Sequence, residues 1–217
     1  DVCAKLRGLF HEKRIGHAGT LDPMATGVLP VFVGRATRAV EFASEGDKEY
    51  LAGLRLGTVT DTQDTSGRVL EEHPVSVTRE ELEAALAPFR GEIQQLPPMY
   101  SAIKINGKKL YELARKGREV ERKPRAITIH SLVVEGQESA TDFLIRVRCS
   151  KGTYVRTLCH DIGQALGCGG TMYSLRRTMA AGFPLEDALP LEQVLQAEDP
   201  ASLLLGVDAY FAGRPVL

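Results

Sequence analysis

The stretch GHAGTLDPMATGVLPV, residues 16–31, places one carboxylate, that of Asp22, among glycines, small residues and apolar side chains. Its glycines allow tight turns and the close approach of another molecule's backbone, and Pro23 biases Asp22 away from the helical region. These residues predict a rigid loop that projects Asp22. They also fit an aspartate that caps a helix beginning at Pro23, and the residues alone leave that alternative open.

Hydrophobic periodicity around this loop predicts both strands and helices. Apolar or alternating runs indicate strands at 28–34, 48–57, 126–134 and 143–150. Apolar residues at helical spacing indicate helices near 2–10, over 79–90, near 108–116 and over 152–167. Thr78 and Glu81 form a capping box at the start of the second of these helices. Because no regular βαβ rhythm connects the elements, the expected fold class is α+β.

The charge of the chain is nearly balanced but unevenly distributed. The 217 residues carry a net charge of −1 at pH 7. Between Lys104 and Arg125, nine lysines and arginines stand against three glutamates, a local balance of +6 that leaves −7 for the remainder. Such clustering indicates a phosphate-binding surface, although a solvated basic face fits the charges equally well. Within it, Asn106 and Gly107 predict a turn.

Several function classes are disfavoured by the sequence. The four cysteines show no CxxC pair, which favours reduced thiols and a cytoplasmic location. No apolar run approaches the roughly 20 residues of a membrane span, and no secretory leader is expected. Asp61 and Asp64 in TDTQDTSG, residues 60–67, lack the other ligands of a calcium loop, so we interpret this segment as a solvated loop bordering the active cleft. His160 and Asp161 have no serine or cysteine nucleophile context. We therefore expect neither a metal site nor acyl chemistry.

Five ordered blocks resemble the TruB family of tRNA pseudouridine synthases, in its bacterial stand-alone type. They are residues 16–31, KEYLAGLRLGTVTDTQDTSG at 48–67, QLPPMYSAIKINGKKLYELARKG at 95–117, CSKGTYVRTLCHDIG at 149–163 and SLRRT at 174–178. The resemblance covers about residues 2–210. It implies the pseudouridine-synthase fold, with a mixed, mainly antiparallel sheet flanked by helices and a basic thumb-like insertion at about 98–126. Residues 1–217 are then expected to form the catalytic domain, without the family's N-terminal Lys-Pro motif and its C-terminal PUA-type domain.

The resemblance also implies a reaction. The family isomerises the uridine at position 55, in the T-loop of tRNA, to pseudouridine: the N-glycosidic bond breaks, the uracil turns over and C5 bonds to the ribose. No cofactor or metal is implied. Asp22 matches the catalytic aspartate, and attack at C1′, attack at C6 and elimination to a glycal all stay open. Arg156 matches the arginine that pairs with this carboxylate, and we expect it to keep Asp22 ionised.

Other matched positions are implied to bind the substrate. Tyr50 matches the tyrosine that stacks on the target base and takes part in proton transfer, Tyr154 and Leu175 match pocket residues, and His17 matches a histidine that fills the space left by the flipped nucleotide. By position alone, Tyr50, Tyr154 and Leu175 would be packing residues and Arg156 a boundary residue. The basic side chains expected to meet phosphates are Lys104, Lys108, Lys109, Arg115 and Lys116.

The implied partner is the T-arm of tRNA, and the protein is expected to bind it as a monomer. No membrane partner is expected. Two alternatives remain. Guide-RNA-dependent relatives with the same fold modify ribosomal RNA, and a tRNA-folding chaperone with incidental catalysis would use the same surface.

Overall fold

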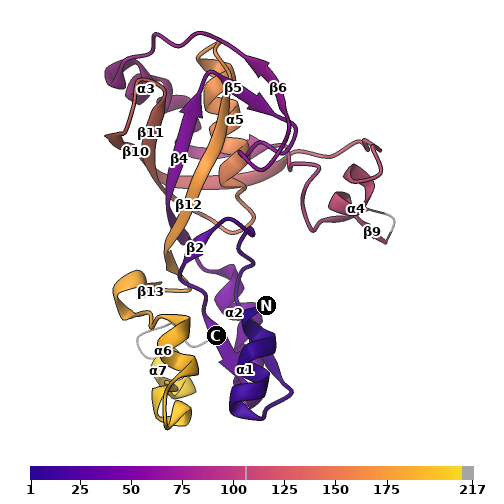
Figure 1. Ribbon diagram of the computed structural model, residues 1–217, viewed down its shortest axis with the longest axis vertical. Coiled ribbons are helices and arrows are strands. Elements are labelled where there is room, and N and C mark those ends of the chain that lie inside the picture. The colour runs from indigo at the N-terminus through magenta and orange to yellow at the C-terminus, as the bar shows by residue number, and fades with distance from the viewer. Residues whose placement is uncertain (106, 212–217) are drawn as a thin grey trace.

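The computed structural model describes residues 1–105 and 107–211, and its main element is a seven-stranded sheet (Figure 1). The strand order is β13-β12-β4-β11-β10-β7, with β2 paired to β12 off this path. The strands are β2 (Thr26–Gly27), β4 (Lys48–Leu56), β7 (Gly91–Gln95), β10 (Arg125–Gln137), β11 (Asp142–Cys149), β12 (Gly170–Ala180) and β13 (Phe183–Pro184). Neighbouring strands are antiparallel except β2 and β12, which are parallel. The α+β class and the mixed, mainly antiparallel sheet are confirmed.

Two helices pack on this sheet and bury the main hydrophobic core. α3 (Arg79–Ala85) contacts β10, while α5 (Val155–Ala165) contacts β12 and β4. Leu82 of α3, Leu158 of α5 and Phe143 of β11 are fully buried in one continuous cluster. This packing fixes the first turn of α5, which carries Arg156, against the centre of the sheet.

The helix expected over 79–90 is shorter than its apolar stripe suggests. The capping box is present, because Thr78 accepts from the Glu81 amide while Glu81 accepts from the Thr78 amide. The α-helix nevertheless ends at Ala85, and a 3₁₀ turn, η2 (Ala87–Phe89), follows. Pro88 explains the difference, since it has no amide hydrogen to continue the helical ladder.

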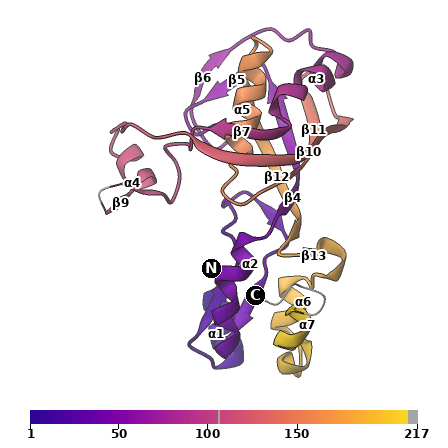
Figure 2. The same cartoon turned by 180° about the vertical axis from the view of Figure 1, so that it is seen from behind.

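A second group of elements packs at the end of the sheet where β4 begins and β12 ends (Figures 1 and 2). It contains β1 (Ile15–His17), β3 (Val31–Val33), α1 (Val2–Phe10), η1 (Gly34–Ala39), α2 (Val40–Glu45), η3 (Leu185–Asp187), α6 (Leu191–Leu195), η4 (Pro200–Leu203) and α7 (Val207–Phe211). Two small cores hold these elements together. The strand expected at 28–34 is only β3, because Gly34 already has left-handed φ and begins η1. The loop that carries Asp22 lies where this group meets the sheet.

The basic insertion forms an arm that projects from the sheet between β7 and β10 in both views (Figures 1 and 2). It contains β8 (Lys104–Ile105), β9 (Lys108–Lys109) and α4 (Leu110–Ala114), so the helix expected near 108–116 is present but shorter. Asn106 of the expected Asn106–Gly107 turn lies outside the described residues.

A smaller hairpin, β5 (Thr58–Thr60) and β6 (Val69–Glu72), carries residues 61–68 toward α5. Across residues 1–105 and 107–211, no helix has the length and apolar character needed to cross a lipid bilayer.

Candidate active site

The Asp22 loop is a turn anchored on β12. The Ala25 amide donates to the Asp22 carbonyl over 2.9 Å, and no helix begins at Pro23. The helix-cap alternative is therefore wrong. β2 begins at Thr26, directly after Ala25, and Gly27 pairs with Arg177 of β12, so the loop returns to the sheet at once.

The buried guanidinium of Arg177 hydrogen-bonds backbone carbonyls at both ends of this loop. Its Nη2 donates to the Gly19 carbonyl over 3.0 Å and its Nε donates to the Val28 carbonyl over 2.8 Å. The Val28 amide in turn donates to the Arg177 carbonyl over 2.9 Å. Because Arg177 is only 1% exposed, these bonds are shielded from water, and they set the position from which Asp22 projects.

We expect Gly27→Ala to destabilise the protein strongly. Gly27 has a φ of 103°, and an added Cβ would lie 2.1 Å from the Arg177 carbonyl oxygen. Both the backbone strain and the clash would separate β2 from β12, so the free energy of unfolding should fall by more than about 2 kcal/mol. Urea unfolding measures this change.

Gly8→Ala is the matched control for that substitution. Gly8 lies in α1 with nothing within 4 Å of an added Cβ, so alanine there should stabilise by roughly 0.5–1 kcal/mol. Equal changes in the free energy of unfolding for Gly27→Ala and Gly8→Ala would show that β2 accommodates a side chain at Gly27 without loss of stability.

One arginine joins two carboxylates at the centre of the site. Arg156 Nη2 lies 2.8 Å from Asp22 Oδ1, and its Nη1 lies 3.6 Å from Asp64 Oδ2. The side chains of Arg156 and Asp64 are 9% and 6% exposed, whereas that of Asp22 is 29% exposed. Asp22 is therefore the carboxylate of this trio that can reach a ligand.

The interpretation of residues 60–67 as a solvated loop is wrong for Asp64. This carboxylate accepts bonds from the Thr62 hydroxyl over 2.8 Å and from the Ser66 amide over 3.0 Å, and it also accepts from the Ser66 hydroxyl. Gln63, in left-handed backbone, contacts the neighbouring turn of α5 through a 2.7 Å bond from the Thr157 hydroxyl. The loop thus turns inward and supplies the second partner of Arg156.

The pKa of the Asp22 carboxyl depends on burial and on two neighbouring charges. Burial raises the pKa of the Asp22 carboxyl, Arg156 opposes this shift, and the charge of Asp64 adds to it. The net shift is upward, because the one guanidinium is shared by two carboxylates while the site excludes much of the water. Arg156 favours the ionised carboxylate, but burial has the larger effect on the pKa.

Tyr50 lies beside these groups on β4, opposite Arg177 in the β4–β12 register. Burial raises the pKa of its phenol and the negative charge of Asp22 adds to the shift, whereas Arg177 lowers it by charge and hydrogen bonding. Tyr50 is half-buried and packs against the main core, which also contains Leu175, 7% exposed. The phenol is therefore neutral at ordinary pH and partly accessible.

Two further predicted residues lie near this centre. Tyr154, half-buried, is the residue immediately before α5 and so adjoins the turn of Arg156. His17 is the last residue of β1, at the start of the Asp22 loop, and among the described residues its buried Nδ1 has no hydrogen-bond partner. Asp22, Tyr50 and Arg156 are thus brought together, and Tyr154 and His17 lie on the segments that lead to them.

The predicted phosphate-binding residues are not part of this cluster. Lys104, Lys108 and Arg115 are exposed on the projecting arm, and Lys109 is half-buried there. Lys109 and Arg115 each lie 5.3 Å from the centre of the Tyr111 ring. The arm therefore presents several cations, two of them ordered by one aromatic ring.

Sequence reasoning missed three buried residues of the site. Asp64 stands between Thr62 and Ser66, and such hydroxyl-flanked aspartates typically form local hydrogen-bonded turns, which was a usable signal. Arg177 occupies a strand position within SLRRT, where a core-facing arginine is rare. Gln95 contacts Tyr154, 59 residues away, and nothing local indicates this contact.

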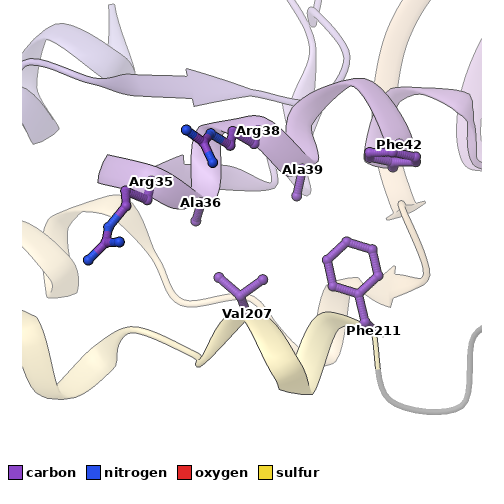
Figure 3. Close-up of a pocket in the computed structure, with 7 residues that line it drawn as sticks. All are labelled: Arg35, Ala36, Arg38, Ala39, Phe42, Val207 and Phe211. Carbon is purple, nitrogen blue, oxygen red and sulfur yellow. The ribbon is translucent and has the colours of Figure 1, made fainter. Parts of the chain in front are cut away.

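Other features do not add to this site. A pocket between η1, α2 and α7 is lined by Arg35, Ala36, Arg38, Ala39, Phe42, Val207 and Phe211 (Figure 3), none of which is a predicted site residue. In the part of the chain that the structure describes, no group of three or more His, Cys, Asp or Glu side chains is placed to hold a metal ion.

Comparison with known proteins gives consistent matches. Residues 7–155 match the TruB family pseudouridylate synthase (N terminal domain), and residues 156–209 match the tRNA pseudouridylate synthase B C-terminal domain. The boundary between these two matches falls within α5, inside the fold described above.

Relatives named tRNA pseudouridine synthase B are identical to this chain at about half of the aligned residues. The protein of Azoarcus sp. (strain BH72) is 53% identical, covering 96% of this chain and 70% of its own length. The protein of Clostridium kluyveri is 46% identical, and the match covers 99% of this chain and 74% of that protein. That of Heliobacterium modesticaldum is 53% identical, covering 92% and 66%.

Solved structures extend the likeness to the fold. A Cbf5-Nop10-Gar1 complex contains a chain that is 32% identical with a TM-score of 0.70, covering 89% of this chain and 49% of that one. An H/ACA RNP bound to a substrate RNA containing 2′-deoxyuridine gives 29% identity and a TM-score of 0.66, covering 89% and 47%. The chain thus spans about half of these structures. On the extent of the family match and the identity to its members, this chain belongs to the TruB family of pseudouridylate synthases.

Proposed function

We propose that this chain isomerises uridine to pseudouridine in the T-loop of tRNA, at position 55, without a cofactor or a guide RNA. The observation that carries the proposal is the placement of one accessible carboxylate, Asp22, 2.8 Å from a buried arginine and beside a half-buried tyrosine. The names of the relatives give the same reaction and the same class of substrate.

The proposed chemistry begins with a nucleotide flipped out of its stack, as enzymes that act on a base require. Asp22 acts as the nucleophile and bonds to the substrate, at C1′ as the bond from N1 to C1′ breaks or at C6 before it breaks. The uracil then turns over and a bond from C5 to C1′ forms, and the bond to Asp22 breaks again, which frees the carboxylate. C5 loses a proton and N1 gains one, so the overall change is an isomerisation. Tyr50 stacks on the base, and Tyr154 and Leu175 line its pocket.

In this proposal the RNA is held largely by its phosphates and its shape. His17 fills the space that the flipped nucleotide leaves, and the arm meets the T-arm backbone with Lys104, Lys108, Lys109, Arg115 and Lys116. T-loops present splayed bases that suit recognition by shape. We further propose that residues 1–217 form a monomeric catalytic domain acting in the cytoplasm, where its four buried free thiols stay reduced.

Neutralising two lysines of the arm should weaken RNA binding without slowing the chemistry. For Lys104→Gln combined with Lys108→Gln, we expect a lower affinity for a T-arm hairpin and a log–log salt slope reduced by roughly 1 to 2, since each phosphate contact contributes about 0.9 on B-DNA. The single-turnover rate at saturating RNA should not change. Fluorescence anisotropy at several salt concentrations measures the slope. The control is Lys5→Gln with Lys13→Gln, on exposed positions near α1; an equal loss there would contradict a specific role of the arm.

Removing the charge of Asp64 should move the acidic limb of the activity profile to lower pH. Asp64 raises the pKa of Asp22, and the reaction requires the ionised form of Asp22, so activity rises as the pH increases through that pKa. Asp64→Asn lowers the pKa of Asp22 and brings the rise to a lower pH. The profile of single-turnover rates checks this. A uniform loss of rate with an unmoved limb would mean that Asp64 acts only by holding Arg156.

The proposed function is tested on a tRNA transcript with no other RNA present. We expect pseudouridine at position 55 and nowhere else, mapped by carbodiimide modification, and none when that uridine is replaced by cytidine. Absence of product from a transcript that the chain binds would contradict the proposal.

A guide-dependent activity is the second candidate, because the likeness to the Cbf5-Nop10-Gar1 complex and to the H/ACA RNP favours it. Product that forms only after a guide RNA is added would support it. A chaperone role would instead appear as tRNA refolding that persists when no pseudouridine forms.

A further inference from the structure

Gln95 joins the base of the arm to the entrance of α5. It is the last residue of β7 and only 2% exposed. Its Nε2 donates to the Tyr154 carbonyl over 3.0 Å, and its Oε1 accepts from the Tyr154 amide over 2.8 Å. The carboxamide therefore hydrogen-bonds both the amide and the carbonyl of Tyr154, as the backbone of a neighbouring strand would.

Tyr154 needs such a partner because of its place in the chain. It precedes the first helical residue of α5, in extended backbone, and no side chain caps the helix there. Its carbonyl also accepts from the Leu158 amide over 3.0 Å, which begins the helical ladder. Its amide lies outside that ladder, and an unpaired amide at a buried position is unfavourable. Gln95 thus sets where α5 begins.

The turn that Gln95 holds is the turn that carries Arg156. One residue, Val155, separates Tyr154 from Arg156, and the next residue, Thr157, donates a 2.7 Å hydrogen bond to Gln63. The first turn of α5 is therefore held from two sides, by the Asp64 loop and by Gln95. A shift of this turn would move the guanidinium that lies 2.8 Å from Asp22.

The same glutamine marks the base of the arm. The arm leaves the sheet directly after Gln95 and returns at Arg125, and these two residues are partners in the β7–β10 register. Arg122 closes the base further by donating to the Pro97 carbonyl over 3.0 Å. A displacement of the arm would therefore be passed to Gln95, the residue that hydrogen-bonds the backbone of Tyr154.

We infer that Gln95 is a positioning residue whose carboxamide transmits the placement of the basic arm to Tyr154 and Arg156. This inference rests on the proposed function for its kinetic consequence, although the contact itself can be tested without it. Gln95 does not touch the reacting atoms. Its role is to keep Tyr154 and the Arg156 guanidinium correctly placed relative to Asp22 while the arm binds the RNA.

The test compares Gln95→Met, which has a similar length but neither polar atom, with Gln94→Met on the exposed neighbouring position. Gln95→Glu is the second variant, since it keeps the acceptor and loses the donor. For both Gln95 variants we expect hairpin affinity within about threefold of the parent and a single-turnover rate lower by about ten- to a hundredfold, because small misplacements of positioned groups have effects of that size. Assays run at a temperature at which each variant is folded, checked by circular dichroism.

Hydrogen exchange supplies a readout that does not depend on activity. In Gln95→Met the amides of Tyr154 and of the first turn of α5 should exchange at least about tenfold faster, and in Gln94→Met they should not. Unchanged exchange, or a rate and affinity that fall together and equally for both positions, would overturn the inference. If the parent makes no pseudouridine, the proposed function fails, and the exchange result alone still decides whether Gln95 holds this turn.

Discussion

Arg156→Met is expected to lower both the stability of the protein and its activity. The substitution leaves Asp22 and Asp64 without the cation they share, and the side chain of Asp64 is only 6% exposed. Removing one member of a buried ion pair typically costs about 3–5 kcal/mol, because the charge left behind is uncompensated. We expect a loss of that order in urea unfolding and a single-turnover rate reduced more than about a hundredfold, because Asp22 is no longer held in place.

Two further substitutions give this prediction its controls. Arg148 pairs with Asp47 at 3.4 Å on the sheet surface and is 51% exposed, so Arg148→Met should change stability by less than about 1 kcal/mol. Arg156→Lys keeps the charge but not the fork that reaches two carboxylates, and it should lose activity while losing less stability than methionine. If Arg156→Met costs no more stability than Arg148→Met, the ion trio does not hold the site together.

The strands and the site loop were predictable because their signals are local. The alternation from Lys48 to Leu56 predicts β4, and the glycines and the proline around Asp22 predict a tight loop. The same residues also fit a helix beginning at Pro23, and only the structure excludes that alternative. The capping box at Thr78 was equally visible. Pro88 limits α3 to fewer residues than its apolar stripe, because it has no amide donor to continue the helix, while Phe89 still packs against the main core from η2.

The partners of the site residues were less predictable, since they depend on contacts between distant parts of the chain. That Arg156 pairs with Asp22 followed from family resemblance, whereas its second partner, Asp64, was placed in solvent. The direction of the Asp22 pKa shift could not be predicted for the same reason. It depends on burial and on a second carboxylate, which only the folded loop brings close. Gln95 gave no signal, because its partner Tyr154 lies 59 residues away in the chain.

Asp22→Asn is expected to abolish the reaction while leaving the fold and RNA binding intact. Asparagine has the same shape and retains an oxygen that can accept from Arg156. The carboxylate form of Asp22 is disfavoured by burial, so its removal should change the free energy of unfolding by less than about 1 kcal/mol. Loss of the attacking group should lower the rate at least about a thousandfold. This combination separates a chemical role from a structural one.

The most direct measurement is tritium release from a T-arm hairpin whose target uridine is labelled at C5, with the parent chain and Asp22→Asn compared at excess protein and without guide RNA. Anisotropy on the same hairpin confirms that both bind. The account predicts complete release by the parent and none above background by the variant. Equal release from both would contradict the role of Asp22, and bound hairpin with no release from the parent would contradict the proposed reaction.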